Sequence, residues 1–156
     1  MTTFTVALTL LLAALGQPAR AVNPSPSVVF VCEHGAAKSL VATAYFNKLA
    51  SDRGLTERAT FRGVAPQEAL SVSTVAGLRA DGIPIPDGTP TAIGQTDVTG
   101  ATHIFAIGCT LPAVAASSGK AADWSDVPDG QGYVAMRDAI VAHVRTLLDE
   151  IQRRKP

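Results

Sequence analysis

A short, uninterrupted apolar segment is the feature that most constrains the fold of this chain. Residues Ser27 to Cys32 (SVVFVC) are mostly β-branched or aromatic, and they lie between a proline-rich leader and a glycine-containing turn. Such a run is typical of a strand that is buried on both faces of a parallel sheet. We therefore expect a buried parallel strand here.

A helix is predicted directly after this strand, from about Lys38 to Arg53. Apolar side chains recur at spacings of three and four residues, and Gly54 stands where the helix should end. The next segments repeat the alternation, with a strand over Ala59 to Val64 and a helix over Ser71 to Ala80. Strand and helix thus alternate from the start of the domain.

The second half of the chain continues this order with weaker signals. Four of its segments have a recognisable pattern: an irregular connection over Ile83 to Thr91, a helical turn over Gln95 to Gly100, a strand over His103 to Gly108 and a long amphipathic helix over Tyr133 to Ile151. A polar, small-residue loop is expected between Cys109 and Trp124. The alternation predicts a doubly wound α/β domain with a parallel sheet.

Composition narrows the class of protein. The chain has 156 residues, 47% of them hydrophobic and 17% charged, which suits one folded domain rather than a disordered chain. Its 13 basic and 13 acidic residues balance, which argues against nucleic-acid binding. With 2 Cys and 3 His, a structural metal site is not expected.

The amino terminus reads as an export signal. An uncharged apolar run over Val6 to Leu15 precedes Ala19-Arg20-Ala21, so cleavage is predicted after Ala21 and the protein is expected in the periplasm. The run is too short to be a stable membrane anchor. The predicted organisation is a signal peptide over 1–21, an extended leader over 22–26 and one domain over 27–154.

The loop after the first strand is the strongest candidate for an oxyanion site. Its backbone N–H groups can converge on an anion at the N-terminus of the following helix. Cys32 would lie beneath this cradle, where the helix end and the Lys38 ammonium favour the thiolate, and Ser39 could donate a hydrogen bond to the sulfur. The predicted cradle consists of Glu33, His34, Gly35, Ala36, Ala37, Lys38 and Ser39.

Simpler interpretations of these residues remain open at this point. An isolated cysteine at a strand end is commonly a small buried hydrophobe. His34 can be an ordinary loop residue, and Glu33 is expected to face solvent, because a carboxylate turned inward would oppose a bound anion.

The segment from Val28 to Ala50 resembles the phosphate-binding loop of low-molecular-weight protein tyrosine phosphatases and of the thioredoxin-coupled arsenate reductases that share their fold. Two later segments, Leu78 to Ile83 and Trp124 to Pro128, resemble a helix end and the Asp-Pro acid loop of that family. The resemblance covers most of residues 27 to 151, and it implies one α/β domain with a four-stranded parallel sheet flanked by helices.

The chain departs from the family loop at one position. The family has arginine where this chain has Lys38. A guanidinium holds two oxyanion oxygens as a planar fork, whereas an ammonium is a flexible point charge. The exchange puts ordinary phosphatase turnover in doubt, although the backbone cradle does not depend on it.

The resemblance also implies an aspartate that protonates the leaving oxygen. Asp126 is the candidate, because Trp124 and Pro128 bracket it as in the family motif, and a shifted alignment would select Asp129 instead. Either aspartate could also serve as an ordinary turn or helix-capping residue. His103 and His143 are expected to serve packing or solvent contact.

Cys109, at the end of the third strand, is the possible redox partner of Cys32. In the resembled arsenate reductases, a cysteine at the matching strand end attacks the thiol–arsenate adduct, and a third cysteine follows. Residues 110 to 116 contain no such third cysteine, so a two-cysteine mechanism would need an external thiol reductant. A Cys32–Cys109 disulfide and a buried, inert Cys109 are the alternatives.

Three functions are therefore expected, in this order. The first is a thiol phosphatase for phosphomonoesters, with Cys32, Lys38, Ser39 and Asp126 as its catalytic residues. The second is an arsenate reductase that uses Cys32 and Cys109. The third is an exported oxyanion-binding protein with impaired catalysis. None of the three implies a metal or an organic cofactor.

Overall fold

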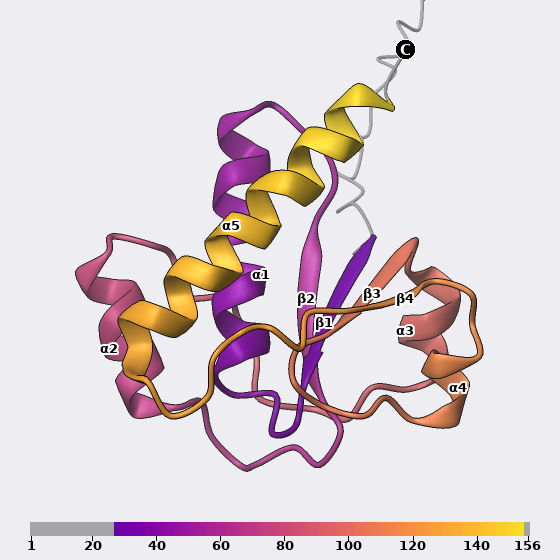
Figure 1. Ribbon diagram of the computed structural model, residues 1–156, viewed down its shortest axis with the longest axis horizontal. Coiled ribbons are helices and arrows are strands. Elements are labelled where there is room, and N and C mark those ends of the chain that lie inside the picture. The colour runs from indigo at the N-terminus through magenta and orange to yellow at the C-terminus, as the bar shows by residue number, and fades with distance from the viewer. Residues whose placement is uncertain (1–26, 155–156) are drawn as a thin grey trace, which may run out of the picture.

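Four parallel strands form the central sheet of the computed structural model, which describes residues 27–154 (Figure 1). β1 (Val28–Cys32) lies between β2 (Ala59–Gly63) and β3 (His103–Ala106), and β4 (Ala121–Asp123) pairs with the outer edge of β3. The strand order is β2-β1-β3-β4. The predicted four-stranded parallel sheet is confirmed.

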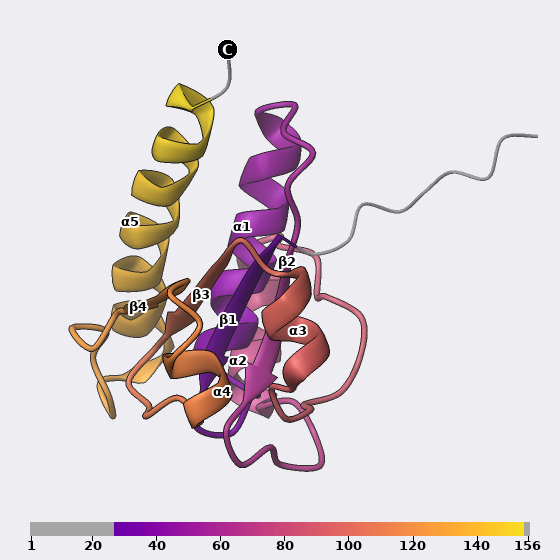
Figure 2. The same ribbon diagram turned by 90° about the vertical axis from the view of Figure 1, so that its right-hand side faces the viewer.

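Helices cover both faces of this sheet (Figure 2). α1 (Lys38–Asp52), α2 (Val72–Ala80) and α5 (Gly132–Arg153) lie on one face, where α1 and α5 pack against each other. The short helices α3 (Gln95–Gly100) and α4 (Ala113–Ala116) lie on the other face. The domain therefore has three layers, as expected for this fold class.

Because β1 is central, its side chains are buried on both faces of the sheet. Phe30 and Cys32 pack into the larger core cluster together with residues of α1 and α5. Val29 and Val31 pack into the smaller cluster beneath α3 and α4. This alternation explains why the strand reads as one continuous apolar run, and it places Cys32 on the α1 side of the sheet.

Two elements lie where only a polar loop was expected, between Cys109 and Trp124. They are α4, with four residues, and β4, whose three residues are all exposed. Neither is long or apolar enough to produce a periodic signal. The third strand is also shorter than predicted, because it ends at Ala106 and not at Gly108. Gly108 instead adopts a φ of +63° in the loop that follows.

A polar cluster ties the end of α2 to the two long helices. The hydroxyls of Tyr45 on α1 and Tyr133 on α5 each donate a hydrogen bond of 2.7 Å to Asp81, which also pairs with Arg137. The bonds from Tyr133 and Tyr45 hold the pKa of Asp81 below its usual value. Both tyrosines thus link the long helices to the end of α2.

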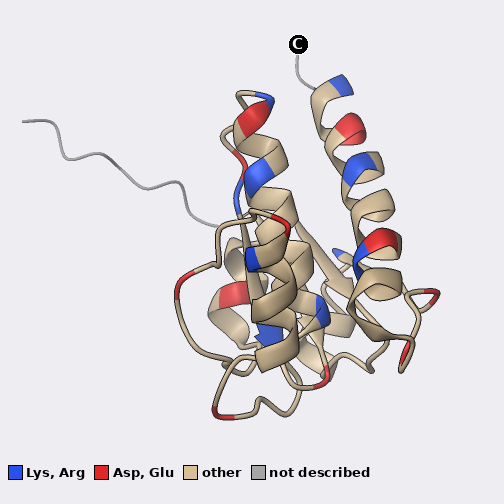
Figure 3. Ribbon diagram, turned by 90° about the vertical axis from the view of Figure 1, so that its left-hand side faces the viewer, with Lys and Arg blue, Asp and Glu red and all other residues tan. Residues whose placement is uncertain are grey.

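Acidic and basic residues are interspersed along α1 and α5 (Figure 3). Within residues 27–154, no helix is long and apolar enough to cross a membrane. The predicted signal peptide over 1–21 and the leader over 22–26 lie outside the described residues.

Candidate functional site

The loop between β1 and α1 is held in its shape by close packing against the end of β2. Gly35 has a φ of +64°, and a Cβ atom at this position would lie only 2.8 Å from the backbone nitrogen of Gly63. A Cβ atom at Gly63 would likewise lie 2.9 Å from the nitrogen of Gly35. Both glycines are therefore required for the backbones to approach this closely.

The carbonyl groups of this loop are turned toward the segment that follows β2. Those of Cys32, Glu33, His34 and Ala36 accept hydrogen bonds from the N–H groups of Val64, Ala65, Gln67 and Ser71, respectively, over 2.8–3.2 Å. In contrast, the N–H groups of residues 34 to 37 donate to no backbone carbonyl in the described part of the chain. With the N-terminus of α1, they are available as oxyanion donors.

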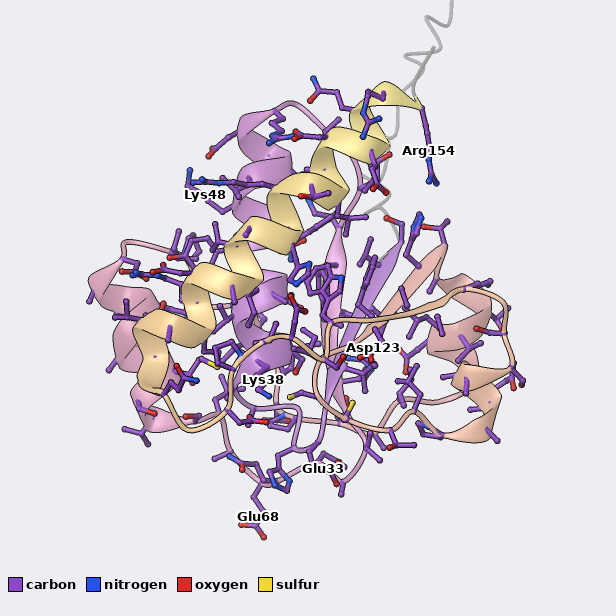
Figure 4. The ribbon with its side chains drawn as sticks, viewed as in Figure 1. Glu33, Lys38, Lys48, Glu68, Asp123 and Arg154 are labelled. Atoms are coloured by element: carbon purple, nitrogen blue, oxygen red, sulfur yellow. The ribbon has the colours of Figure 1, made fainter. Side chains whose placement is uncertain are left out.

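These residues line a cavity of about 450 Å³ at the carboxyl end of the sheet. Figure 4 shows Lys38 and Glu33 at this end of the molecule, far from Arg154 at the other end. Ligands of open α/β sheets bind at this edge. The lining residues are Cys32, Glu33, His34, Ala36, Ala37, Lys38, Gln67, Ser71, Ile107, Gly108 and Asp129.

Cys32 and Ser39 meet at the base of this cavity. The sulfur of Cys32 lies 3.1 Å from the hydroxyl oxygen of Ser39, and both side chains are buried. A hydroxyl at this distance can donate a hydrogen bond to a thiolate. The predicted juxtaposition of cysteine, serine and helix N-terminus is therefore present.

Of the remaining loop residues, Lys38 extends toward the loop after β3. Its side chain is 11% exposed, and its Nζ atom lies 2.5 Å from Oδ1 of Asp129, whose side chain is 80% exposed. The ammonium also lies against Gly108, where a Cβ atom would be only 2.7 Å from Nζ. His34 is held to the segment after β2 by a contact of 3.2 Å between its Nδ1 atom and the carbonyl oxygen of Ala65.

Asp126 lies outside this cavity and faces α5. The Nε2 atom of His143 is 2.9 Å from both carboxylate oxygens of Asp126, and the His143 ring stacks on Trp124 with centroids 4.6 Å apart. Asp126 is not among the residues that line the cavity, whereas Asp129 is. Of the two aspartates that the sequence offers as the acid, the structure therefore brings Asp129 and not Asp126 to the cavity.

Cys109 follows β3 but packs on the opposite side of the sheet from Cys32. It lies against the smaller core cluster, and its sulfur is 3.4 Å from the carbonyl oxygen of Val31. Burial raises the pKa of the Cys109 thiol to about 11. Both cysteines are free thiols in this structure.

Several residues of the cavity were not recognised in the sequence. Gln67 and Ser71 are contributed by the connection after β2, and no local pattern marks them. Gly108 also lines the cavity, and an isolated glycine after an apolar segment is only a weak signal for close backbone approach. Within residues 27–154, no three His, Cys, Asp or Glu side chains gather as metal ligands would.

Comparison with known proteins gives matches among solved structures only. No protein-family model matches the sequence, and no curated protein matches it. The chain is similar to the YfkJ protein of Bacillus subtilis, with 22% identity, a TM-score of 0.71 and coverage of 84% of this chain and 97% of that one.

Two further structures match at similar levels. A low-molecular-weight phosphotyrosine phosphatase of Vibrio cholerae is 17% identical, with a TM-score of 0.72 over 84% of this chain and 99% of that one. A thioredoxin-dependent arsenate reductase of Corynebacterium glutamicum is 20% identical, with a TM-score of 0.70 over 86% of this chain and 65% of that one. The chain therefore has the fold of these phosphatases and arsenate reductases, as the resemblance implied.

Proposed function

We propose that this chain is a cysteine-dependent phosphatase that hydrolyses phosphomonoesters through a cysteinyl-phosphate intermediate. The observation that carries the proposal is Cys32 at the base of the cavity, 3.1 Å from Ser39 and beneath a loop whose N–H groups have no backbone partner among the described residues. A nucleophile under preorganised donors is the arrangement that acyl and phosphoryl transfer require.

The reaction has two steps. The Cys32 thiolate attacks phosphorus while the bond to the leaving oxygen breaks, and the loop amides and Lys38 hold the phosphoryl oxygens. Water then attacks the thiophosphate, and Ser39 stabilises the departing thiolate by donating a hydrogen bond. The leaving oxygen takes its proton from the Lys38–Asp129 pair at the cavity, a contribution worth about 10²–10⁴ in rate.

The test is phosphate release from p-nitrophenyl phosphate by reduced protein, beside Cys32→Ser and Cys109→Ser variants. We expect turnover to be lost with Cys32→Ser and retained with Cys109→Ser. Mass spectrometry of acid-quenched protein should show one phosphoryl group on Cys32. Phosphate binding without turnover in the wild type would instead identify an oxyanion-binding protein.

Arsenate reduction is the second candidate, supported by the two free thiols at neighbouring strand ends. Cys109 would have to leave its apolar surroundings to attack a Cys32–arsenate adduct, and the resulting disulfide would need an external dithiol as reductant. Formation of arsenite that depends on both cysteines and on the dithiol would support this function over the first.

Export is part of the proposal. The apolar run and the small-residue pattern that ends at Ala21 support cleavage after Ala21 and a periplasmic location. Mass spectrometry of the protein recovered from a periplasmic fraction would test this, with Val22 as the expected first residue.

A further inference from the structure

The loop lysine, Lys38, forms an ion pair with Asp129 at the cavity. Nζ of Lys38 is 2.5 Å from Asp129, and the lysine side chain is only 11% exposed. Asp129, which is 80% exposed, approaches it from the mouth of the cavity. The lysine thus lies beside the oxyanion cradle, and the carboxylate lies over it.

Gly108 makes this position available to the ammonium. Any side chain at Gly108 would begin 2.7 Å from Nζ and 3.8 Å from Oδ2 of Asp129. The lysine is therefore confined between the loop after β3 and the loop before α5, and its charge is directed into the cavity that Cys32 also lines.

The chemistry of the two cations differs at this point. A guanidinium stays protonated in proteins and can only bind an oxyanion, whereas an ammonium can give up a proton and take one back. A carboxylate engaged in a short ion pair holds no proton of its own to donate. The proton carrier of the pair is therefore the ammonium.

We propose that Lys38 is the catalytic proton donor of the phosphatase reaction and that Asp129 is a positioning residue that acts through it. This inference rests on the proposed function. When Cys32 displaces the leaving group, the ammonium of Lys38 transfers one proton to the leaving oxygen and becomes a neutral amine, while Asp129 remains a carboxylate.

The second step restores the starting state. Water attacks the phosphorus of the cysteinyl phosphate, one of its protons passes to the neutral amine of Lys38, and the bond to sulfur breaks. Phosphate leaves, Cys32 returns as a thiolate and Lys38 returns as an ammonium. Over the full cycle one water is consumed and one alcohol and one phosphate are formed, with no external acid, base or reductant.

The test compares two aryl phosphates that differ in their need for a proton. The leaving group of 2,4-dinitrophenyl phosphate departs as a stable anion, whereas phenolate from phenyl phosphate benefits from protonation. With Lys38→Arg, we expect the rate of Cys32 phosphorylation to fall at least about 10²-fold more for phenyl phosphate than for the dinitrophenyl ester. Lys48→Arg, a matched exchange elsewhere on α1, should leave this ratio unchanged.

A second variant separates proton transfer from charge. In Lys38→Ala, added methylammonium should restore phenyl phosphate turnover, while guanidinium at the same concentration should not. Equal losses for both esters in Lys38→Arg, or equal rescue by the two cations, would overturn the inference and leave Lys38 as a binding charge. Failure of the wild type to phosphorylate Cys32 with the dinitrophenyl ester would instead overturn the proposed function.

Discussion

The two cysteines occupy similar places in the chain and differ in almost everything that determines reactivity. Cys32 is the last residue of β1, and Cys109 lies shortly beyond the end of β3, the strand that pairs with β1. Cys32 precedes the N-terminus of α1 and contacts the Ser39 hydroxyl, whereas Cys109 packs against the smaller, apolar core cluster. A strand end therefore does not make a cysteine reactive, and the donors that the next segment supplies decide the chemistry.

The largest difference between the two sites is expected in turnover. Cys32→Ser should lower phosphate release from p-nitrophenyl phosphate by at least about 10⁴-fold, because the serine hydroxyl is a much weaker nucleophile. Cys109→Ser should change it by less than about two-fold, since the cavity does not include Cys109. A large loss with Cys109→Ser in a normally folded variant would contradict the assignment of a one-cysteine mechanism.

The reactivity of Cys109 itself gives the next prediction. With a pKa of about 11, roughly one Cys109 thiol in 10³ is ionised at pH 8, because each pH unit below the pKa lowers the thiolate fraction about ten-fold. In the Cys32→Ser variant, alkylation by iodoacetamide should therefore rise about ten-fold per unit from pH 8 to pH 10.

Unfolded protein in guanidinium chloride provides the reference for this experiment. There the same thiol should titrate near the ordinary value of about 8.5, so its alkylation rate should already level off above pH 9. Matching pH profiles in the folded and unfolded protein would show that burial does not raise the pKa of Cys109.

The sequence predicts those parts of the fold and of the site whose residues form a contiguous pattern in the chain. The strand, loop and helix around Cys32 are predictable, because the apolar run, the glycine and the periodic helix are contiguous. β4 is not, because its three exposed residues carry no pattern. The Lys38–Asp129 pair joins distant segments, so only the fold brings it together.

For the same reason, the sequence could not decide whether Asp126 or Asp129 reaches the cavity. Three positions separate them, and residue spacing alone cannot say on which side of the loop each carboxylate lies. In the structure, His143 of α5 stacks on Trp124 and contacts the carboxylate of Asp126, whereas Asp129 pairs with Lys38.

The same substitution at the two aspartates provides a matched comparison, and its effect on turnover is expected to be smaller than that of Cys32→Ser. Asp129→Asn should lower turnover of phenyl phosphate by about 10²-fold, because the ammonium of Lys38 loses the partner that positions it. Asp126→Asn removes a carboxylate that is 68% exposed and that pairs with His143 outside the cavity, so we expect a change of less than about three-fold. If steady-state kinetics instead show the larger loss with Asp126→Asn, Asp126 and not Asp129 is the aspartate that the reaction needs.

The smallest effect on turnover is expected from removal of the Ser39 hydroxyl, which contacts Cys32. Ser39→Ala should slow breakdown of the cysteinyl phosphate about ten-fold, because the departing thiolate loses one hydrogen bond worth about 1.5 kcal/mol. The first step depends less on this bond, so rapid-quench kinetics should show an undiminished burst followed by slower turnover. Thr43→Val is the control, since the Thr43 hydroxyl is buried on the same helix and has no hydrogen-bond partner among residues 27–154. Equal slowing in both variants would mean that packing of α1, and not the Ser39 hydrogen bond, governs the second step.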